Sequence, residues 1–253
     1  RQMALGQNIE LIFSKNLIKE FAKRGYKPEY GARELRREIR SILENELAKQ
    51  IFQEVDNTLV FHQHLHDGDK IKIGDIAFIV EGKIQSILIS ERLVLNCMQR
   101  MSGIATKTHA LSQQIAHTSA KLLDTRKTTP GFRACEKWAV KIGGGENHRF
   151  ALYDMIMLKD NHNDFAGGIT AAIQKTQAYL KETGRDLKII VEARNLAEIE
   201  EILQSEGIHR ILIDNFNFED TKKAVNLIGT KCQTESSGNI NETTIRQYAE
   251  CGV

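Results

Sequence analysis

Short apolar runs alternate with stretches of helical periodicity in the second half of the chain. Brief apolar runs bounded by polar residues indicate buried strands, and apolar residues that recur every three or four positions indicate amphipathic helices. Strands that alternate with helices usually pair in parallel, so the pattern predicts an α/β fold, either an open sheet or a β/α barrel. The predicted strands are residues 121–123, 154–158, 187–191, 210–213 and 232–236, and the clearest helices between them are 171–180, 196–205 and 218–228.

The first hundred residues follow a different rhythm. The turn sequences HDGD and GD separate short apolar runs there and are hairpin signals. A helix then runs with little interruption from Ser90 beyond Ala105. The other elements predicted in this part are a strand at 9–13, helices at 16–23 and 33–50, and short strands at 59–65, 70–73 and 77–80.

Polar and charged side chains follow the last apolar residue of each of the five later strands. The carboxyl-terminal strand ends of a β/α barrel build its active site, and an open sheet uses the same edge. Several converging strand ends favour the barrel. The alternative is that charges simply begin where a strand leaves the core, which explains one or two strand ends better than all five. The strand-end residues are Thr125, Arg126 and Lys127; Lys159 and Asp160; Glu192; Asp214 and Asn215; and Ser236, Ser237 and Gly238.

Charge and composition narrow the class of protein. A formal net charge of +2 argues against a dedicated nucleic-acid binder. No apolar run approaches the roughly 20 residues that span a bilayer. The four cysteines lie far apart without a CxxC pair, which predicts free thiols in a cytoplasmic, reducing compartment. Within this balanced chain the segment 126–149 is mainly basic, which predicts a site for a small anion.

The types of charge at the strand ends suggest the ligand. Arg, Lys and His can bind carboxylates and phosphates, and Arg does so through two parallel hydrogen bonds. Two carboxylates among these cations could hold a divalent metal, accept hydrogen bonds from sugar hydroxyls, or stabilise a cationic transition state. A Ser-Gly turn could present backbone N–H groups to a phosphate. The cations are Arg126, Lys127, His148, Arg149 and Lys159, the carboxylates are Glu192 and Asp214, and the turn is Ser237-Gly238.

Long motifs in residues 51–253 resemble the quinolinate phosphoribosyltransferase family. They are ERLVLNCMQRMSGIAT, LDTRKTTPGFRACEKWAVKIGGGENHR, LYDMIMLKDNH, VEARN, LIDN and ESSGN, in the family's order. The resemblance implies transfer of phosphoribosyl from phosphoribosyl pyrophosphate to quinolinate with decarboxylation. The products are nicotinate mononucleotide, pyrophosphate and carbon dioxide, a step of NAD biosynthesis. It also implies a partial α/β sandwich domain at 51–101 followed by an incomplete β/α barrel of the type II phosphoribosyltransferase kind at 102–253.

The resemblance assigns roles to individual residues, with Mg²⁺ as the metal. Arg92 would complete the site of a neighbouring subunit, which implies a homodimer. The quinolinate carboxylates would bind to Arg126, His148, Arg149 and Lys159; Lys127 would contact phosphoribosyl pyrophosphate; Glu192 and Asp214 would face the ribose and its Mg²⁺; and Ser237 and Gly238 would hold a phosphate. The catalytic groups would be Lys127, Lys159, Glu192 and Asp214.

The chain departs from the family pattern at two positions and at both ends. Asn239 stands where a second glycine is usual, and Asn163 stands where an apolar residue is usual. The resemblance further implies that the family's opening segment and its last strand with a phosphate loop lie outside these 253 residues.

The first fifty residues resemble a different family. RGYKPEYGARELRREIRSILENELAKQI is similar to the small carboxyl-terminal domain of Clp-type AAA+ ATPases, a short α+β piece in which Arg33 would sense nucleotide. No Walker A or B motif occurs in the chain, so ATP hydrolysis is not expected of it. A solvated residue at a helix start is the simpler interpretation of Arg33.

Other functions stay open at this point. Lys159 or Lys127 could form an imine in a Schiff-base lyase, and the Clp-like piece could act as a non-catalytic assembly module. A relative that uses nicotinate is less favoured because the many cations suit two ligand carboxylates. His62, His64 and His66 would share one strand face and could bind a metal, although solvated side chains are the simpler interpretation. Lys137 and Lys141 would either add to the anion site or face water.

Overall fold

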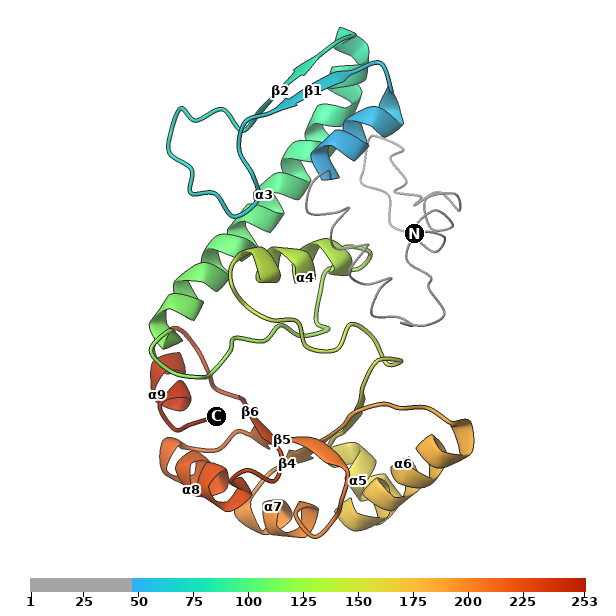
Figure 1. Cartoon of the computed structure of the whole chain (residues 1–253), viewed down its shortest axis with the longest axis vertical. Coiled ribbons are helices and arrows are strands. Elements are labelled where there is room, and N and C mark those ends of the chain that lie inside the picture. Colours follow the sequence, from blue (N-terminus) through green and yellow to red (C-terminus); the bar gives the residue numbers. More distant parts are fainter. Residues whose placement is uncertain (1–46) are drawn as a thin grey trace. The chain divides into compact units, whose positions relative to one another are not determined.

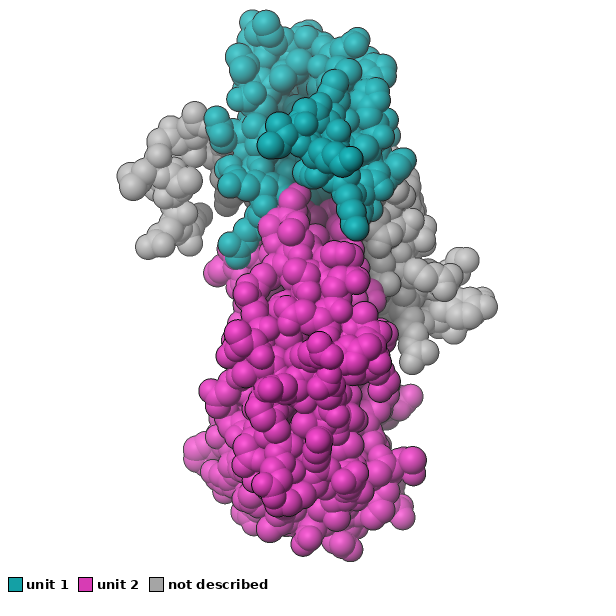
Figure 2. Space-filling model, turned by 90° about the vertical axis from the view of Figure 1, so that its left-hand side faces the viewer, with its two compact units in different colours: residues 1–100 teal, residues 101–253 magenta. Residues whose placement is uncertain are grey.

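The computed structural model describes residues 47–253. The chain forms two compact units that are divided between Arg100 and Met101, coloured separately in Figure 2. No helix in the described part of the chain is both long enough and apolar enough to cross a membrane.

In the first unit, an antiparallel hairpin packs on two helices. Strand β1 (Val60–Gln63) pairs with β2 (Phe78–Glu81), and a helical stretch at 47–55 precedes them. Helix α3 (Ile84–Ile115) begins after β2. Phe52, Leu59 and Val94 form the core, and the stacked rings of Phe61 and Phe78 lie against it with centroids 4.7 Å apart. The hairpin therefore buries one apolar face, because successive side chains of a strand point to opposite sides.

The predicted strand at 70–73 is absent, and turn chemistry explains why. The backbone N–H of Lys72 donates to Asp75 Oδ2 at 2.7 Å, and the Asp75 N–H donates back to the Lys72 carbonyl at 3.1 Å. Gly74 supplies the positive φ of 94° that this turn requires. Ile73 is fully exposed (108%), so no buried face draws this segment into a sheet.

The second unit is built on a parallel four-stranded sheet with helices between its strands (Figure 1). This confirms the α/β prediction and fits part of a β/α barrel. Helix α8 has the predicted bounds, and the other predicted strands and helices shift by a few residues at their ends. The order is β3 (Ile156–Leu158), β4 (Ile189–Ala193), β5 (Ile208–Asp214) and β6 (Gln233–Ser237); the connecting helices are α6 (Ile169–Thr183), α7 (Leu196–Ile202) and α8 (Phe218–Ile228).

Three further helices belong to this unit. They are α4 (Arg133–Ile142), α5 (Asp160–Ala166) and α9 (Ile245–Ala249). Helix α9 packs Ile245 and Ala249 against Ile115 near the end of α3. Helix α5 follows β3 directly, so its first residues lie at the carboxyl end of the sheet.

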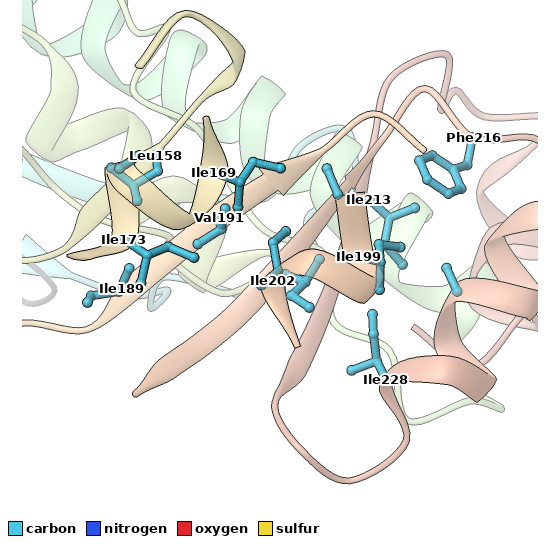
Figure 3. Packing of buried hydrophobic residues seen from close by; sticks show 14 residues of the cluster. Leu158, Ile169, Ile173, Ile189, Val191, Ile199, Ile202, Ile213, Phe216 and Ile228 are labelled. Carbon is cyan, nitrogen blue, oxygen red and sulfur yellow. The ribbon is translucent and has the colours of Figure 1, made fainter. Parts of the chain in front are cut away.

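The core of the second unit lies between the sheet and its helices. Ile189, Val191 and Ala193 of β4 all belong to this cluster, together with Ile199 of α7 and Ile228 of α8 (Figure 3). Successive side chains of a strand point to opposite faces, so alternate residues of β4 point away from the helices. The other face of the sheet is therefore free to carry polar residues.

The first predicted strand of the alternating region, at 121–123, is wrong as a strand. Only an isolated parallel bridge forms there, between Leu123 and Glu146. The Glu146 N–H donates to the Leu122 carbonyl at 2.8 Å, and the Asp124 N–H donates to the Glu146 carbonyl at 3.1 Å. The run is too short to extend this ladder, but the bridge still holds 121–124 parallel to the segment that leads to His148.

Candidate active site

Alternation along the strands gathers the predicted site residues on one face. The odd-numbered residues of β4 (Ile189, Val191 and Ala193) face the helices, so Glu192 points to the opposite face of the sheet, which we call the inner face. Ile211 and Ile213 of β5 likewise face the helices, which turns Asp214 inward. The register pairs Asp214 with Ser237 of β6. The strand ends Lys159, Glu192, Asp214 and Ser237 therefore share the inner face at the carboxyl edge of the sheet.

Lys159 and Glu192 form an ion pair between neighbouring strands. Their Nζ and Oε2 atoms are 3.4 Å apart; the Lys159 side chain is 46% exposed and that of Glu192 only 8%. Lys159 is also the N-cap residue directly before helix α5, and its backbone N–H donates to His162 Nδ1 at 3.0 Å. His162 thus orients the strand end that carries the lysine.

Asp214 is held by hydrogen bonds on both carboxylate oxygens. Ser237 Oγ donates to Oδ1 at 2.6 Å, and Asn215 Nδ2 donates to Oδ2 at 2.6 Å. Asn215 itself has a positive φ of 58°. These contacts hold the carboxylate at the rim of the sheet.

The turn after β6 depends on Gly238. A Cβ atom at this position would lie 2.1 Å from Asn215 Oδ1, and φ is +83°. Asn239 follows with φ of 57°, a left-handed conformation that Asn tolerates better than other side-chain residues, and its Nδ2 donates to Asn215 Oδ1 at 3.2 Å. Asn239 in place of glycine is therefore compatible with the turn.

Arg126 and Arg149 are close enough to repel each other. Burial and the charge of Arg126 lower the pKa of Arg149, against the opposite effect of Asp154 and Glu235. The buried Arg126 Nε has no hydrogen-bond partner among residues 47–253. Within the described part of the chain, the Arg149 guanidinium makes weak hydrogen bonds, to the Met155 carbonyl at 3.4 Å and to Met157 Sδ at 3.6 Å. Two adjacent guanidinium groups with poorly used donors are suited to an anion.

Asp124 is an organising residue that the sequence analysis did not select. Its carboxylate accepts hydrogen bonds from Asn147 Nδ2 at 2.5 Å, from the His148 backbone N–H at 2.9 Å, and from Lys137 Nζ. Lys137 is 3% exposed, so it neither faces water nor lies free for a ligand. The position of Asp124 directly after an apolar run was a signal that could have identified it.

Glu235 is the second residue that was missed. It lies on the inner face of β6, two residues before Ser237, and pairs in register with Leu212. Its carboxylate accepts from His148 Nε2 at 3.1 Å and Arg210 Nη1 at 2.8 Å. Counting back two positions from the strand end would have found it, because side chains two apart share a face.

Two predicted residues make none of these contacts. Lys127 is exposed, and its backbone N–H donates to Thr125 Oγ1 at 3.0 Å. Arg92 is exposed on α3 in the first unit. Arg33 lies outside the described residues, as do the elements predicted within 1–46. Asn163, where the family usually has an apolar residue, is buried in α5, and no described residue hydrogen-bonds to its Oδ1.

The histidine-metal hypothesis for the first unit has no support. Strand β1 ends at Gln63, so strand alternation does not continue to His64 and His66. His62 Nε2 lies 3.8 Å from Glu81 Oε1. Within residues 47–253 no group of three or more His, Cys, Asp or Glu side chains could hold a metal.

Comparison with protein families covers nearly the whole chain. Residues 104–253 match the model of the quinolinate phosphoribosyl transferase C-terminal domain, and residues 45–102 match that of its N-terminal domain. Residues 1–60 match the model of the C-terminal, D2-small domain of ClpB protein.

Individual relatives agree with the family models. The chain is 42% identical over 221 residues to quinolinate phosphoribosyltransferase [decarboxylating] 1b of Nicotiana tabacum, covering 82% of this chain and 63% of that relative. It is 40% identical to the chloroplastic nicotinate-nucleotide pyrophosphorylase [carboxylating] of Arabidopsis thaliana, with 82% and 63% covered. The chain thus spans less than two thirds of the length of these relatives.

Solved structures extend the similarity to three dimensions. NadC from Streptococcus pyogenes has a TM-score of 0.75 at 38% identity, covering 80% of this chain and 70% of that one. The nicotinate-nucleotide pyrophosphorylase from Francisella tularensis has a TM-score of 0.77 at 36% identity, with 83% and 73% covered.

Proposed function

Since the chain belongs to the quinolinate phosphoribosyltransferase family, we propose that the inner face of its second unit is a site for phosphoribosyl transfer to quinolinate. The reaction would take phosphoribosyl pyrophosphate as donor and release pyrophosphate and carbon dioxide. Nicotinate mononucleotide would be the product, which places the protein in NAD biosynthesis.

The pair of adjacent arginines carries this proposal. Arg126 and Arg149 repel each other and leave guanidinium donors poorly used. A ligand with carboxylates would offset that repulsion and accept charge-assisted hydrogen bonds from both groups. Quinolinate has two carboxylates on adjacent ring carbons, so one small ligand could engage both arginines and Lys159.

The acidic residues suit the sugar half of the reaction. Departure of pyrophosphate leaves positive charge on the ribose carbon and ring oxygen. Glu192 and Asp214, from adjacent parallel strands, would stabilise that charge or accept hydrogen bonds from ribose hydroxyls. The ring nitrogen of quinolinate then attacks the ribose carbon, so no covalent intermediate with the protein is required.

Loss of carbon dioxide follows from the new bond. The alkylated ring nitrogen is positive and lies beside a carboxylate, so the electron pair left on the ring carbon by carbon dioxide is stabilised by that charge. The ring carbon then takes up a proton from water to give the product. Arg126 and Arg149 would hold the ring in place during this step. The carboxylate that departs is the one next to the ring nitrogen, and the other stays bound.

Mg²⁺ fits the donor set as a metal shared with the substrate. Mg²⁺ prefers oxygen ligands and commonly binds one or two carboxylates together with substrate phosphates and water. Glu192 and Asp214 would hold it, and it would neutralise charge on the pyrophosphate group. Ser237 and the turn at Gly238 would contact a phosphate.

A dimer would complete the site through Arg92. Leu88, Arg92 and Leu95 lie four and three residues apart on α3 and are all exposed. Residues with this spacing share one helix face. Exposed leucines beside an arginine are suited to a subunit interface, where Arg92 would reach the partner's quinolinate.

Two other functions have weaker support. A Schiff-base lysine is typically desolvated in an apolar pocket or set beside another cation, whereas Lys159 is half exposed and paired with Glu192. An assembly role would rest on the ClpB-like residues 1–60, most of which lie outside the described part. A cytoplasmic location is supported by the four cysteines, none of which forms a disulfide bond in the described part of the chain.

Calorimetric titration with quinolinate tests the proposed function. Arg149→Ala should weaken binding by about tenfold or more, because a charge-assisted hydrogen bond contributes roughly 1.5–3 kcal/mol. Lys181→Ala removes an exposed cation from the last turn of α6 and should leave affinity unchanged. Equal affinity of wild type and Arg149→Ala would contradict the proposed substrate contact.

A further inference from the structure

His148 has both of its ring nitrogens engaged within the protein. The Arg149 backbone N–H donates to Nδ1 at 2.7 Å, and Nε2 lies 3.1 Å from Glu235 Oε2. The side chain is 6% exposed. The ring therefore lies between the backbone of its own loop and strand β6.

These two contacts assign the tautomer of His148. A backbone N–H can only donate, so Nδ1 must carry a lone pair rather than a proton. A carboxylate can only accept, so the proton is on Nε2 and points to Glu235. A neutral imidazole in this tautomer has no N–H left for a ligand.

Glu235 is itself fixed and charged. Burial acts to raise the pKa of its carboxyl, but the hydrogen bonds from His148 and Arg210 and the positive charge of Arg210 outweigh burial and hold that pKa below its ordinary value. Arg210 donates from Nη1 to Glu235 at 2.8 Å and from Nη2 to Gln233 Oε1 at 2.8 Å. The carboxylate is thus anchored between β5 and the loop that carries Arg149.

We infer that Glu235 is a positioning residue that locks His148 against the Arg149 backbone and withholds the imidazole from the ligand. The carboxylates of the ligand then bind to Arg126, Arg149 and Lys159, and His148 does not contact them. This differs from the role that the family resemblance implies for His148. As a statement about ligand binding it rests on the proposed function, whereas the tautomer can be measured without any ligand.

Long-range ¹H–¹⁵N correlation spectra of the ¹⁵N-labelled 253-residue chain test the inferred tautomer of His148 directly. The His148 signals, assigned by their loss in His148→Phe, should show a proton on Nε2 and none on Nδ1. Saturating quinolinate should leave this pattern unchanged. A proton on Nδ1, with or without quinolinate, would overturn the inference.

Variants of β6 separate positioning from general stability. Glu235→Gln keeps an oxygen acceptor for Nε2–H and should retain the tautomer, with quinolinate affinity within about threefold of wild type. Glu235→Leu removes the acceptor and should mix the tautomers and weaken quinolinate binding by about tenfold. Gln233→Ala is the matched control, because it removes a contact of Arg210 on the same strand face without touching His148.

The outcomes distinguish this inference from the proposed function. If Glu235→Leu keeps the wild-type tautomer and affinity, Glu235 does not position His148. If the wild-type chain shows the expected tautomer but does not bind quinolinate, the positioning of His148 by Glu235 is supported and the proposed function is wrong. If Gln233→Ala also loses the wild-type tautomer, any disturbance of β6 would change the tautomer of His148. That outcome would overturn the assignment of the positioning role to Glu235.

Discussion

At the scale of single residues, the turn at Gly238 is the most constrained point of the site. Gly238→Ala combines a positive φ with a Cβ 2.1 Å from Asn215 Oδ1 and 2.9 Å from the Asn215 nitrogen. Left-handed strain costs an alanine roughly 1–2 kcal/mol, and the close contact should add about 1–3 kcal/mol. Urea unfolding should therefore show a larger loss for Gly238→Ala than for Gly184→Ala.

Gly184 isolates the conformational part of that cost. It follows the last residue of α6 with φ of 63°, and no atom of the described residues lies within 4 Å of a Cβ built there. Equal losses of unfolding free energy in the two variants would mean that Asn215 moves aside freely. In that case Gly238 would not be required for the close approach of the two loops.

The sequence identified site residues at the strand ends but missed the residues, such as Glu235 and Asp124, that hold them in place. Lys159, Glu192 and Asp214 could be found because each directly follows an apolar run. Glu235 lies within a strand whose residues are mostly polar, so no contrast marked it. The burial of Lys137 likewise depends on Asp124, a partner 13 residues away whose approach no local pattern reveals.

At the scale of elements, agreement follows the strength of the local signals. Helix α8 matches its predicted bounds because Asn217 caps it and apolar residues repeat at helical spacing. The runs at 70–73 and 121–123 look alike in composition, but the first is taken up by a turn and the second has one bridging partner. Strand formation requires a paired neighbour, which a short apolar run does not specify.

The cap of α7 offers a test at this scale, since it directly follows the strand that carries Glu192. Asn195 Oδ1 accepts from the Glu198 N–H at 3.0 Å. Asn195→Ala should lower the free energy of unfolding by about 1 kcal/mol, and Asn195→Asp should retain most of it because a carboxylate also caps. Denaturant unfolding of both variants provides the measurement, and equal losses would show that capping is not the role of Asn195.

At the scale of the whole molecule, the proposed dimer makes each quinolinate site depend on two chains. Arg92 would come from one subunit and Arg149 from the other, so Arg92→Ala and Arg149→Ala damage different halves of a site. Mixing the two variants after unfolding and refolding should give dimers in which one of the two sites has both arginines. With random pairing, half of the dimers are mixed, so about a quarter of all sites should bind quinolinate with wild-type affinity in calorimetry.

The matched control for this mixture is Arg126→Ala with Arg149→Ala. Both of these arginines would serve the site of their own subunit, so mixed dimers contain no intact site and binding should not recover. If the Arg92 mixture also fails to recover while sedimentation shows dimers, Arg92 does not reach across the interface. If both mixtures recover, the arginines of the second unit are themselves shared between chains, because only sharing could then restore a complete site.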